Sequence, residues 1–281
     1  MKSLLGYYGG KAGPVGAWIT SQLPPHDIYV EPFGGMCGIL MQKRPSRVEV
    51  YNDLSGDLVN LFRVVREQPE ALREALALTP YARKEHAAAV RNWQPERVDH
   101  IERARRTYTH LAQSRDGALV SKSFSFGGAA YKGSVADTFV NGQCRIPEVC
   151  GRLRTVLLEC CDWQSICRQH DGPDTLFYLD PPYVRSTRTA NDGYAHEMTD
   201  AQHQELIGWC LRATGSILLS GYDSDLYEPL LAAGWHRRRM KVASHASAAR
   251  QRKSGNAGRT ECLWLNARAA AATPTLFCPT A

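Results

Sequence analysis

The residues most suited to chemistry are Asp180, Pro181, Pro182 and Tyr183, which directly follow the apolar run TLFYL. Proline cannot donate a hydrogen bond to a sheet ladder, so the prolines end the predicted strand. A carboxylate beside a carbonyl that no neighbouring strand claims provides a pair of acceptors, which suits an amino group with two hydrogens. The Tyr183 ring adds a planar face for stacking. The combination favours a site for an exocyclic amine on an aromatic base over a plain strand stop.

A second predicted strand ends in YVEPFGG, where Glu31 is followed by Pro32, Phe33 and a glycine turn that includes Gly35. A glycine turn between a strand and a helix lets a nucleotide-like ligand approach the carboxyl edge of a sheet. The spacing does not match the G-x-G-x-x-G pattern of dinucleotide-binding proteins. A purely structural turn is the alternative interpretation.

Two further residues extend this set. Asp53 closes a strand about twenty residues after Glu31, where Rossmann-like folds place the acid that binds ribose hydroxyls. The alternative is an aspartate that caps the following helix. Near the N-terminus, the sequence YYGGK places Lys11 after a glycine turn. Its ammonium could meet a ligand carboxylate or could remain solvated.

The elements that would position these residues alternate along the chain. Short apolar runs of the β type lie at 27–33, 47–53, 155–160, 175–180, 216–222 and 259–266. Helical periodicity lies between them, at 38–44, 57–68, 199–213 and 223–234, with Thr199 as a predicted N-cap. Strands that alternate with helices predict an α/β fold, with a mostly parallel sheet covered by helices on both faces.

Residues 79–150 break this alternation. The segment begins with two helical patterns, at 81–93 and 98–114, and then becomes rich in glycine, serine, aromatic and basic residues. We therefore expect an insertion at 79–150 between two halves of one catalytic domain, 1–78 and 151–268. The alanine-rich end of the chain, 269–281, is low in complexity and is expected to be a flexible tail.

Composition limits the classes of protein and of partner. The net charge of +6 and the pI near 8.8 are mild, but basic residues cluster at 97–106, 237–241 and 250–259. Such clusters contact phosphate in many proteins, although a solvated surface is the alternative. Nine cysteines without a C-x-x-C pair predict reduced thiols of a cytoplasmic protein, with no metal site. We expect no membrane span and, from residues 1–10, no signal peptide.

The motif set YYGGK, YVEPFGG, ND and LDPPY, in this order, resembles the Dam-type (D12 class) DNA adenine N6-methyltransferases. SGYDSDLY and RTECLWLN are also similar to that family, so the resemblance covers nearly the whole chain. It implies a Rossmann-like methyltransferase sheet, S-adenosylmethionine as cofactor and double-stranded DNA as partner. The insertion would then be the target-recognition domain. A homodimer is left open, and a cytoplasmic, nucleoid-associated protein of bacterial or phage origin is expected.

The resemblance also implies roles for individual residues. Tyr7 and Lys11 would contact the cofactor, Lys11 near its carboxylate. Glu31, Pro32, Phe33 and Gly35 would line the methionine end of the cofactor, and Asp53 would hold the ribose. Asp180, Pro181, Pro182 and Tyr183 would hold the target adenine next to the sulfonium, with Asp180 also beside the cofactor. Two departures stand out: Cys37 replaces a glycine common in the family, and Ser55 replaces an asparagine.

The implied reaction is an in-line attack of adenine N6 on the methyl group. Bonds to Asp180 and the Pro181 carbonyl would localise the N6 lone pair, and the adenine must leave the duplex to reach a strand tip. Basic residues expected to contact DNA lie in the insertion, after the DPPY motif and in the 250–259 cluster: Lys122, Lys132, Arg145, Arg185, Arg188, Arg250, Arg252 and Lys253. An RNA base-amine methyltransferase and a catalytically silent DNA-binding relative are the alternatives. Neither the target sequence nor a role in a restriction system, a prophage or epigenetic regulation follows from the resemblance.

Overall fold

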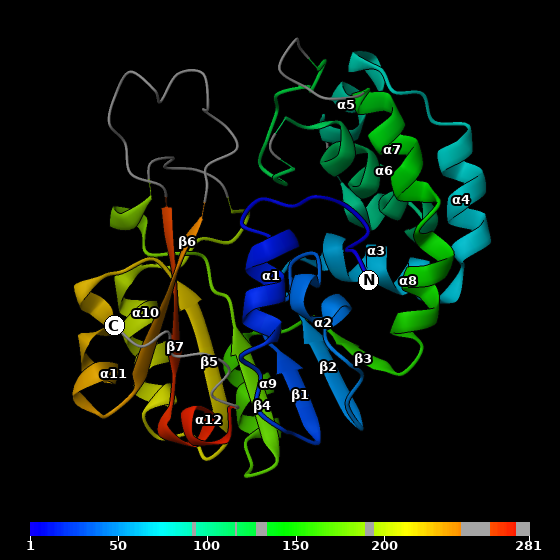
Figure 1. The fold of residues 1–281 in the computed structure, drawn as a ribbon. Coiled ribbons are helices and arrows are strands. Elements are labelled where there is room, and N and C mark those ends of the chain that lie inside the picture. The colour runs from blue at the N-terminus through cyan, green and yellow to red at the C-terminus, as the bar shows by residue number, and fades with distance from the viewer. Residues whose placement is uncertain (92–93, 116, 128–133, 189–193, 243–258, 274–281) are drawn as a thin grey trace.

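A central sheet organises the molecule, which is described by a computed structural model over residues 1–91, 94–115, 117–127, 134–188, 194–242 and 259–273 (Figure 1). Within these residues the sheet has seven strands in the order β3-β2-β1-β4-β5-β7-β6. The neighbouring pairs are parallel, except that β7 runs antiparallel to both β5 and β6. The strand bounds are β1 Ile28–Glu31, β2 Val48–Asn52, β3 Val156–Glu159, β4 Thr175–Leu179, β5 Ser216–Gly221, β6 His236–Val242 and β7 Arg259–Leu265. The expected α/β fold with a mostly parallel sheet is confirmed.

The order of the strands creates a switch point between β1 and β4. The chain proceeds from β1 outward through β2 to β3, and then returns to the centre to start β4 and proceed to the other side. The two central strands are paired in parallel, with Val30 opposite Phe177. Their carboxyl ends therefore lie side by side, which brings the residues after β1 next to those after β4. Ligands of open α/β sheets bind at such a point.

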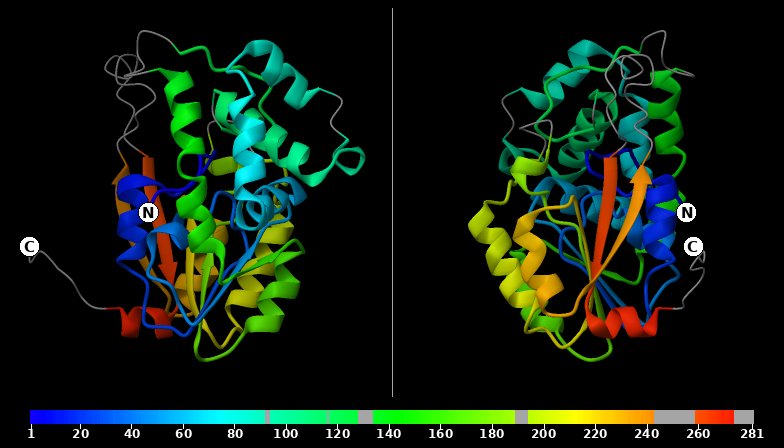
Figure 2. Two further views of the ribbon diagram at one scale, coloured as in Figure 1. Left: turned by 90° about the vertical axis from the view of Figure 1, so that its right-hand side faces the viewer. Right: turned by 60° about the vertical axis from the view of Figure 1, so that its left-hand side comes forward.

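Both faces of the sheet are covered, as Figure 2 shows, and β4 contributes to both cores by alternation. Tyr178 packs with α1 Gly13–Thr20, α2 Gly38–Gln42 and α3 Gly56–Glu67, whereas Phe177 faces the other core. The helices of that second core are α9 Trp163–His170, α10 Asp200–Cys210 and α11 Glu228–Ala232. Thr199 caps α10 with a capping box, as predicted.

The insertion is helical and shares a core with the sheet. Its elements are α4 Pro69–Ala77, which precedes the predicted boundary, α5 Arg83–Val90, the 3-10 turn η1 Pro95–Arg97, α6 His100–Gln113, α7 Val135–Gln143 and α8 Ile146–Leu153. These helices gather at the upper right of Figure 1. Tyr108 of α6 and Phe139 of α7 belong to the same buried cluster as Phe62 of α3. The insertion therefore packs on α3 and shares the core on that side of the sheet.

Three segments of the chain have a structure that differs from the one expected from the sequence. The segment with glycine and aromatic residues continues into α7 and α8, and the basic cluster at 237–241 is the edge strand β6. Within β6, Arg237 and Arg239 lie 2.5 and 2.7 Å from the carboxylate of Asp223. The last of the three is helix α12, Ala267–Ala272, in the stretch expected to be a flexible tail from residue 269; Ala269 is fully buried there. Residues 274–281 lie outside the described part.

The remaining short elements are the 3-10 turns η2 Arg185–Thr187 and η3 Asp225–Tyr227. None of the helices in the described ranges has the length and apolarity needed to cross a bilayer. Those ranges also hold no cluster of three or more histidine, cysteine or acidic residues arranged to bind a metal ion.

Candidate active site

A pocket lies at the switch point, and the sequence-predicted cofactor residues converge on it. Its lining includes residues from the N-terminal loop and from the ends of β1, β2 and β4, which together supply all of that set: Tyr7, Lys11, Glu31, Pro32, Phe33, Gly35, Asp53 and Asp180. Pro182 also lines the pocket, whereas Pro181 and Tyr183 do not. The elements meet here because the carboxyl ends of parallel strands share one edge of the sheet.

Asp53 fixes the glycine turn that follows β1. Its two carboxylate oxygens each accept a backbone N–H, from Gly35 and from Ser55, at 2.8 Å. The N-cap of α3 is Ser55 rather than Asp53, so the capping alternative for Asp53 does not hold. Burial raises the pKa of Asp53, and the two backbone bonds oppose that rise.

Gly35 itself has φ +48°, and a Cβ atom there would lie 3.1 Å from the ring of Tyr7. The turn therefore needs glycine for its backbone and for its contact with Tyr7. Two residues later, Cys37 has φ 56° at the N-cap of α2. A left-handed backbone explains why a glycine is common at this position in the resembling family.

Glu31 is a buried carboxylate, 2% exposed, at the tip of β1. It accepts hydrogen bonds from the Tyr29 hydroxyl and the Leu40 N–H, both at 3.2 Å. Burial raises the pKa of Glu31 to about 8 despite these bonds. Neutral Glu31 is thus the main form near pH 7.

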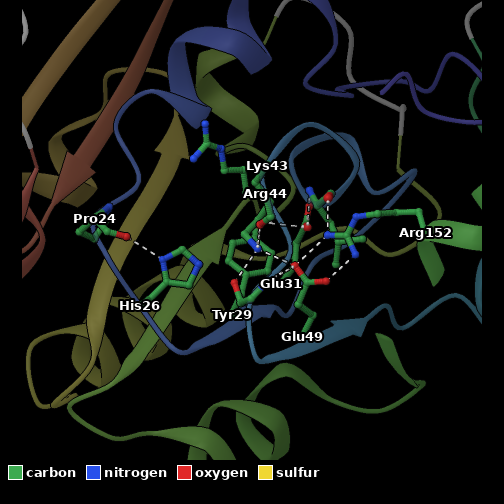
Figure 3. A network of polar contacts seen from close by, with 10 residues as sticks. Pro24, His26, Tyr29, Glu31, Lys43, Arg44, Glu49 and Arg152 are labelled. Carbon is green, nitrogen blue, oxygen red and sulfur yellow. Dashed lines mark hydrogen bonds and ion pairs between the residues drawn. The ribbon is translucent and has the colours of Figure 1, made fainter. Parts of the chain in front are cut away.

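A network of buried charged residues lies beside strand β1, as Figure 3 shows. The Lys43 ammonium lies 2.5 Å from a carboxylate oxygen of Glu49 and 4.4 Å from the centre of the Tyr29 ring. Arg152 of α8 donates to both oxygens of Glu49 and, at 2.9 Å, to the Leu40 carbonyl. The network joins α2, β2 and the last turn of α8, just past the predicted end of the insertion at residue 150. Each of its charges has a partner, as buried charges require.

Lys11 is the cation of the pocket, and it is directed at Asp180. Its ammonium lies 2.8 and 2.9 Å from the two oxygens of Asp180 and donates to the Gly9 carbonyl at 2.9 Å. A second carboxylate, that of Glu261 on β7, lies 3.8 Å away. Burial would lower the pKa of Lys11, but the charges of Asp180 and Glu261 outweigh it and raise the pKa above its usual value. Lys11 therefore stays charged.

Tyr183 is buried, with 4% exposure, which differs from an open stacking platform. Its hydroxyl donates to Glu261, and its ring meets the edge of Tyr222 at 4.7 Å between centroids. The Lys11 ammonium lies 4.7 Å from the centroid of the Tyr183 ring. Stacking of a base on Tyr183 would therefore require some rearrangement of these neighbours.

Comparison with known proteins identifies the family. Residues 7–243 match the D12 class of N6 adenine-specific DNA methyltransferases. The chain belongs to this family. It is similar to the type II methyltransferase M1.LlaDCHI of Lactococcus lactis subsp. cremoris, with 25% identity over 232 residues, covering 74% of this chain and 80% of the relative. The chain is accordingly an adenine-specific DNA methyltransferase with a Rossmann-like sheet, and membership does not support the RNA alternative.

Several residues that line the pocket of this methyltransferase were missed in the sequence. Asp162 and Trp163 follow β3, and the ring of Trp163 lies 6.2 Å from that of Phe33. A third acidic strand end, in LECCDW, is the signal that could have revealed them. Tyr194 also lines the pocket and packs edge-on against Tyr8, at 5.1 Å between ring centroids. No sequence pattern marked this contact.

Of the residues predicted to contact DNA, four lie within the described part of the chain and four lie outside it. Lys122 and Arg185 are exposed. Arg188 is instead 4% exposed and paired with Glu197 at 2.5 Å, so it is not presented to a phosphate in this structure. Arg145 donates to the Ser3 carbonyl at 3.3 Å, a contact between the insertion and the N-terminal segment. Four others lie outside the described residues: Lys132, Arg250, Arg252 and Lys253.

A groove adjoins the pocket on the side of the insertion. Its lining combines Lys122 and other insertion residues with Ser55, Ala195 and His196, which also line the pocket. The groove thus connects residues of the insertion with the edge of the sheet that holds the pocket. Membership in the family implies S-adenosylmethionine as the cofactor and DNA as the substrate of this methyltransferase.

Proposed function

We propose that the methyltransferase binds S-adenosylmethionine in the switch-point pocket and methylates N6 of an adenine that has been flipped out of double-stranded DNA. The observation that carries this proposal is the convergence of Asp53, Glu31 and Asp180, from three strand ends, on one pocket. The carboxyl ends of neighbouring parallel strands meet at the switch point, and three acidic residues gathered there favour a shared ligand site.

The pocket fits the chemistry of the cofactor. The rings of Phe33 and Trp163 offer an apolar wall for an adenine ring, which differs from the place at the methionine end expected for Phe33 from the sequence. Asp53 lies at the strand end typical of ribose binding. Glu31 lines the pocket and offers an oxygen to the ammonium of the methionine part, whereas Lys11 pairs with Asp180 here, so its contact with the cofactor carboxylate stays a prediction. When bound, the cofactor would supply an electrophilic methyl group: the bond from N6 to carbon would form as the carbon–sulfur bond breaks and leaves a neutral thioether, and the proton that N6 loses would pass to the Asp180 carboxylate or to water.

The protein's part in the reaction is to hold and orient the amine. The N6 lone pair of adenine is delocalised into the ring, which makes N6 a poor nucleophile. Acceptance of its hydrogens by Asp180 and by the Pro181 carbonyl would favour a pyramidal nitrogen with a localised lone pair. The Oδ1 atom of Asp180 is buried and, among the described residues, has no hydrogen-bond partner of good geometry, although it lies 2.8 Å from the Lys11 ammonium. Positioning and electrostatics then supply the acceleration.

DNA would approach along the groove between the insertion and the pocket. Exposed Lys122 is placed to contact it there, and exposed Arg185 lies just after the DPPY motif. Arg188 acts inside the protein by pairing with Glu197, so we assign it no phosphate contact. For Arg145, Lys132, Arg250, Arg252 and Lys253 a DNA contact stays a prediction. Binding through phosphates makes affinity fall with added salt.

The role of Asp180 can be tested by its replacement with alanine and with asparagine. Both changes remove the carboxylate that would accept the amine, so we expect transfer of labelled methyl groups to plasmid DNA to fall at least about a hundredfold. DNA affinity, measured by gel shift, should be largely retained because the phosphate contacts lie elsewhere. Asp174→Asn is a matched control, since Asp174 is exposed just before β4. Turnover like that of the unmodified protein in Asp180→Ala would refute the assignment.

A further inference from the structure

The Lys11 ammonium contacts Asp180, the carboxylate that would accept the target amine. Both oxygens of Asp180 lie within 2.9 Å of its nitrogen. An ammonium and an exocyclic amine are both N–H donors, so they compete for the same carboxylate. In the arrangement seen here Lys11 contacts both oxygens of Asp180, and its release would free both of them for the amine. A cation this deeply buried cannot simply move into an apolar surrounding, because an unpaired buried charge is strongly unfavourable.

Glu261 is the alternative partner that the fold provides for Lys11. It lies near the start of β7, and because β7 is antiparallel to β5 its start lies beside the end of β5 at the catalytic edge. Its carboxylate is 3.8 Å from the Lys11 ammonium, so a side-chain movement of about 1 Å would make a close ion pair. The flexible four-carbon stem of lysine permits such a movement.

Glu261 also holds the tyrosine of the DPPY motif. The Tyr183 hydroxyl donates to the same Oε1 atom that faces Lys11. Glu261 is only 6% exposed, and burial raises the pKa of its carboxyl while Lys11 opposes the rise. A buried carboxylate commonly stabilises a strand less than an apolar residue of similar size would. Its position between Lys11 and Tyr183 therefore calls for a functional explanation.

We propose that Glu261 is a positioning residue that holds Tyr183 by its hydroxyl and takes over the Lys11 ammonium when the target amine replaces Lys11 on Asp180. This inference rests on the proposed function. Glu261 touches neither the base nor the cofactor in this scheme and acts through Lys11 and Tyr183. The two carboxylates share one cation, so Lys11 keeps an anionic partner before and after the base enters.

The direct test is Glu261→Gln. Glutamine keeps an oxygen that can accept the Tyr183 hydroxyl but removes the charge that would receive Lys11. We expect kcat for methyl transfer at saturating DNA and cofactor to fall about tenfold or more, a loss equivalent to roughly 1.4 kcal/mol of transition-state stabilisation. The KM for S-adenosylmethionine and the DNA affinity should change less than about threefold. The melting temperature should not fall, because a buried charge has been removed.

Two further variants complete the design. Asp223→Asn changes a carboxylate that pairs with β6 at 2.5 Å and does not line the pocket, so it should retain the unmodified kcat. Tyr183→Phe removes only the hydroxyl contact and should also lower kcat rather than raise the cofactor KM. Rates are normalised to the fraction of protein that binds cofactor in calorimetry, which separates misfolding from slow chemistry.

The outcomes are distinct. An unchanged kcat in Glu261→Gln would overturn the inference, and so would a loss that appears only in the cofactor KM or that follows a lower melting temperature. A protein of unmodified sequence that transfers no methyl group to DNA would overturn the proposed function, and this inference with it. A lower kcat in Glu261→Gln with unchanged KM and melting temperature supports the transfer of Lys11 between the two carboxylates.

Discussion

Glu31 is the residue whose ionisation gives the clearest link between the site and stability. Its ordinary pKa is 4.5, and burial raises it to about 8 in the folded protein. Below pH 4.5 both states are protonated, so Glu31 costs the folded state no ionisation energy. As the pH rises from there to about 8, the unfolded chain releases the proton while the folded protein keeps it, so stability is lost across this window.

Glu31→Gln tests this residue-scale effect, since glutamine can still accept from Tyr29 and Leu40 but cannot ionise. We expect the variant to gain stability relative to the unmodified protein between about pH 5 and pH 8, with an upper bound of about 5 kcal/mol. Urea unfolding at a series of pH values measures the difference. Asp27→Asn, which changes a carboxylate of 63% exposure just before β1, is the control. A Glu31→Gln difference that does not vary with pH would show that Glu31 ionises normally.

A site residue could be predicted where its neighbours in the sequence mark it. Glu31, Asp53 and Asp180 could be found because each follows an apolar strand directly in the sequence. The roles of Glu261 and Arg188 could not, because they depend on which strands and loops become neighbours. Glu261 meets Lys11, 250 positions away in the sequence, only through the antiparallel pairing of β7.

At the scale of elements, the N-terminal glycine turn offers a graded test. A Cβ at Gly9, which has φ +73°, would lie 2.5 Å from the Tyr194 hydroxyl, so alanine there combines strain and a clash in the pocket lining. Gly13→Ala would add strain without a clash, and Gly6→Ala neither. We expect cofactor affinity, measured by calorimetry, to fall about tenfold or more in Gly9→Ala and much less in the other two. Equal affinities in Gly9→Ala and Gly13→Ala would show that the Tyr194 contact is unimportant.

Elements that escaped prediction lack the usual local pattern. The arginines of β6 hide its alternation, and the strand is stabilised by pairing with β7 and by Asp223. Alanine-rich α12 looks like low complexity in the sequence. It is fixed by Asn266, whose side chain bonds the Gly215 carbonyl at 2.8 Å and the Ala269 N–H at 3.0 Å. Thr273 ends the helix and donates to the Gln22 carbonyl at 3.1 Å.

At the scale of the whole molecule, the sheet and the insertion divide the work of the methyltransferase. The switch point between β1 and β4 assembles the pocket, and the insertion packs on α3 so that its residues and the pocket share a groove. Arg152, in the last turn of α8, pairs with Glu49 and so ties the helix that ends the insertion to β2. The order of the motifs along the chain allowed this architecture to be predicted, whereas the shared core of the insertion and the sheet depended on tertiary packing.

The most direct measurement is the identity of the product. The purified protein is incubated with isotopically labelled S-adenosylmethionine and either unmethylated plasmid DNA or structured RNA, and the nucleosides are analysed by mass spectrometry after digestion. We expect the label in N6-methyldeoxyadenosine from DNA, and its loss with Asp180→Ala. Label only in RNA or in cytosine, or no label in any nucleoside despite cofactor binding, would contradict the assignment.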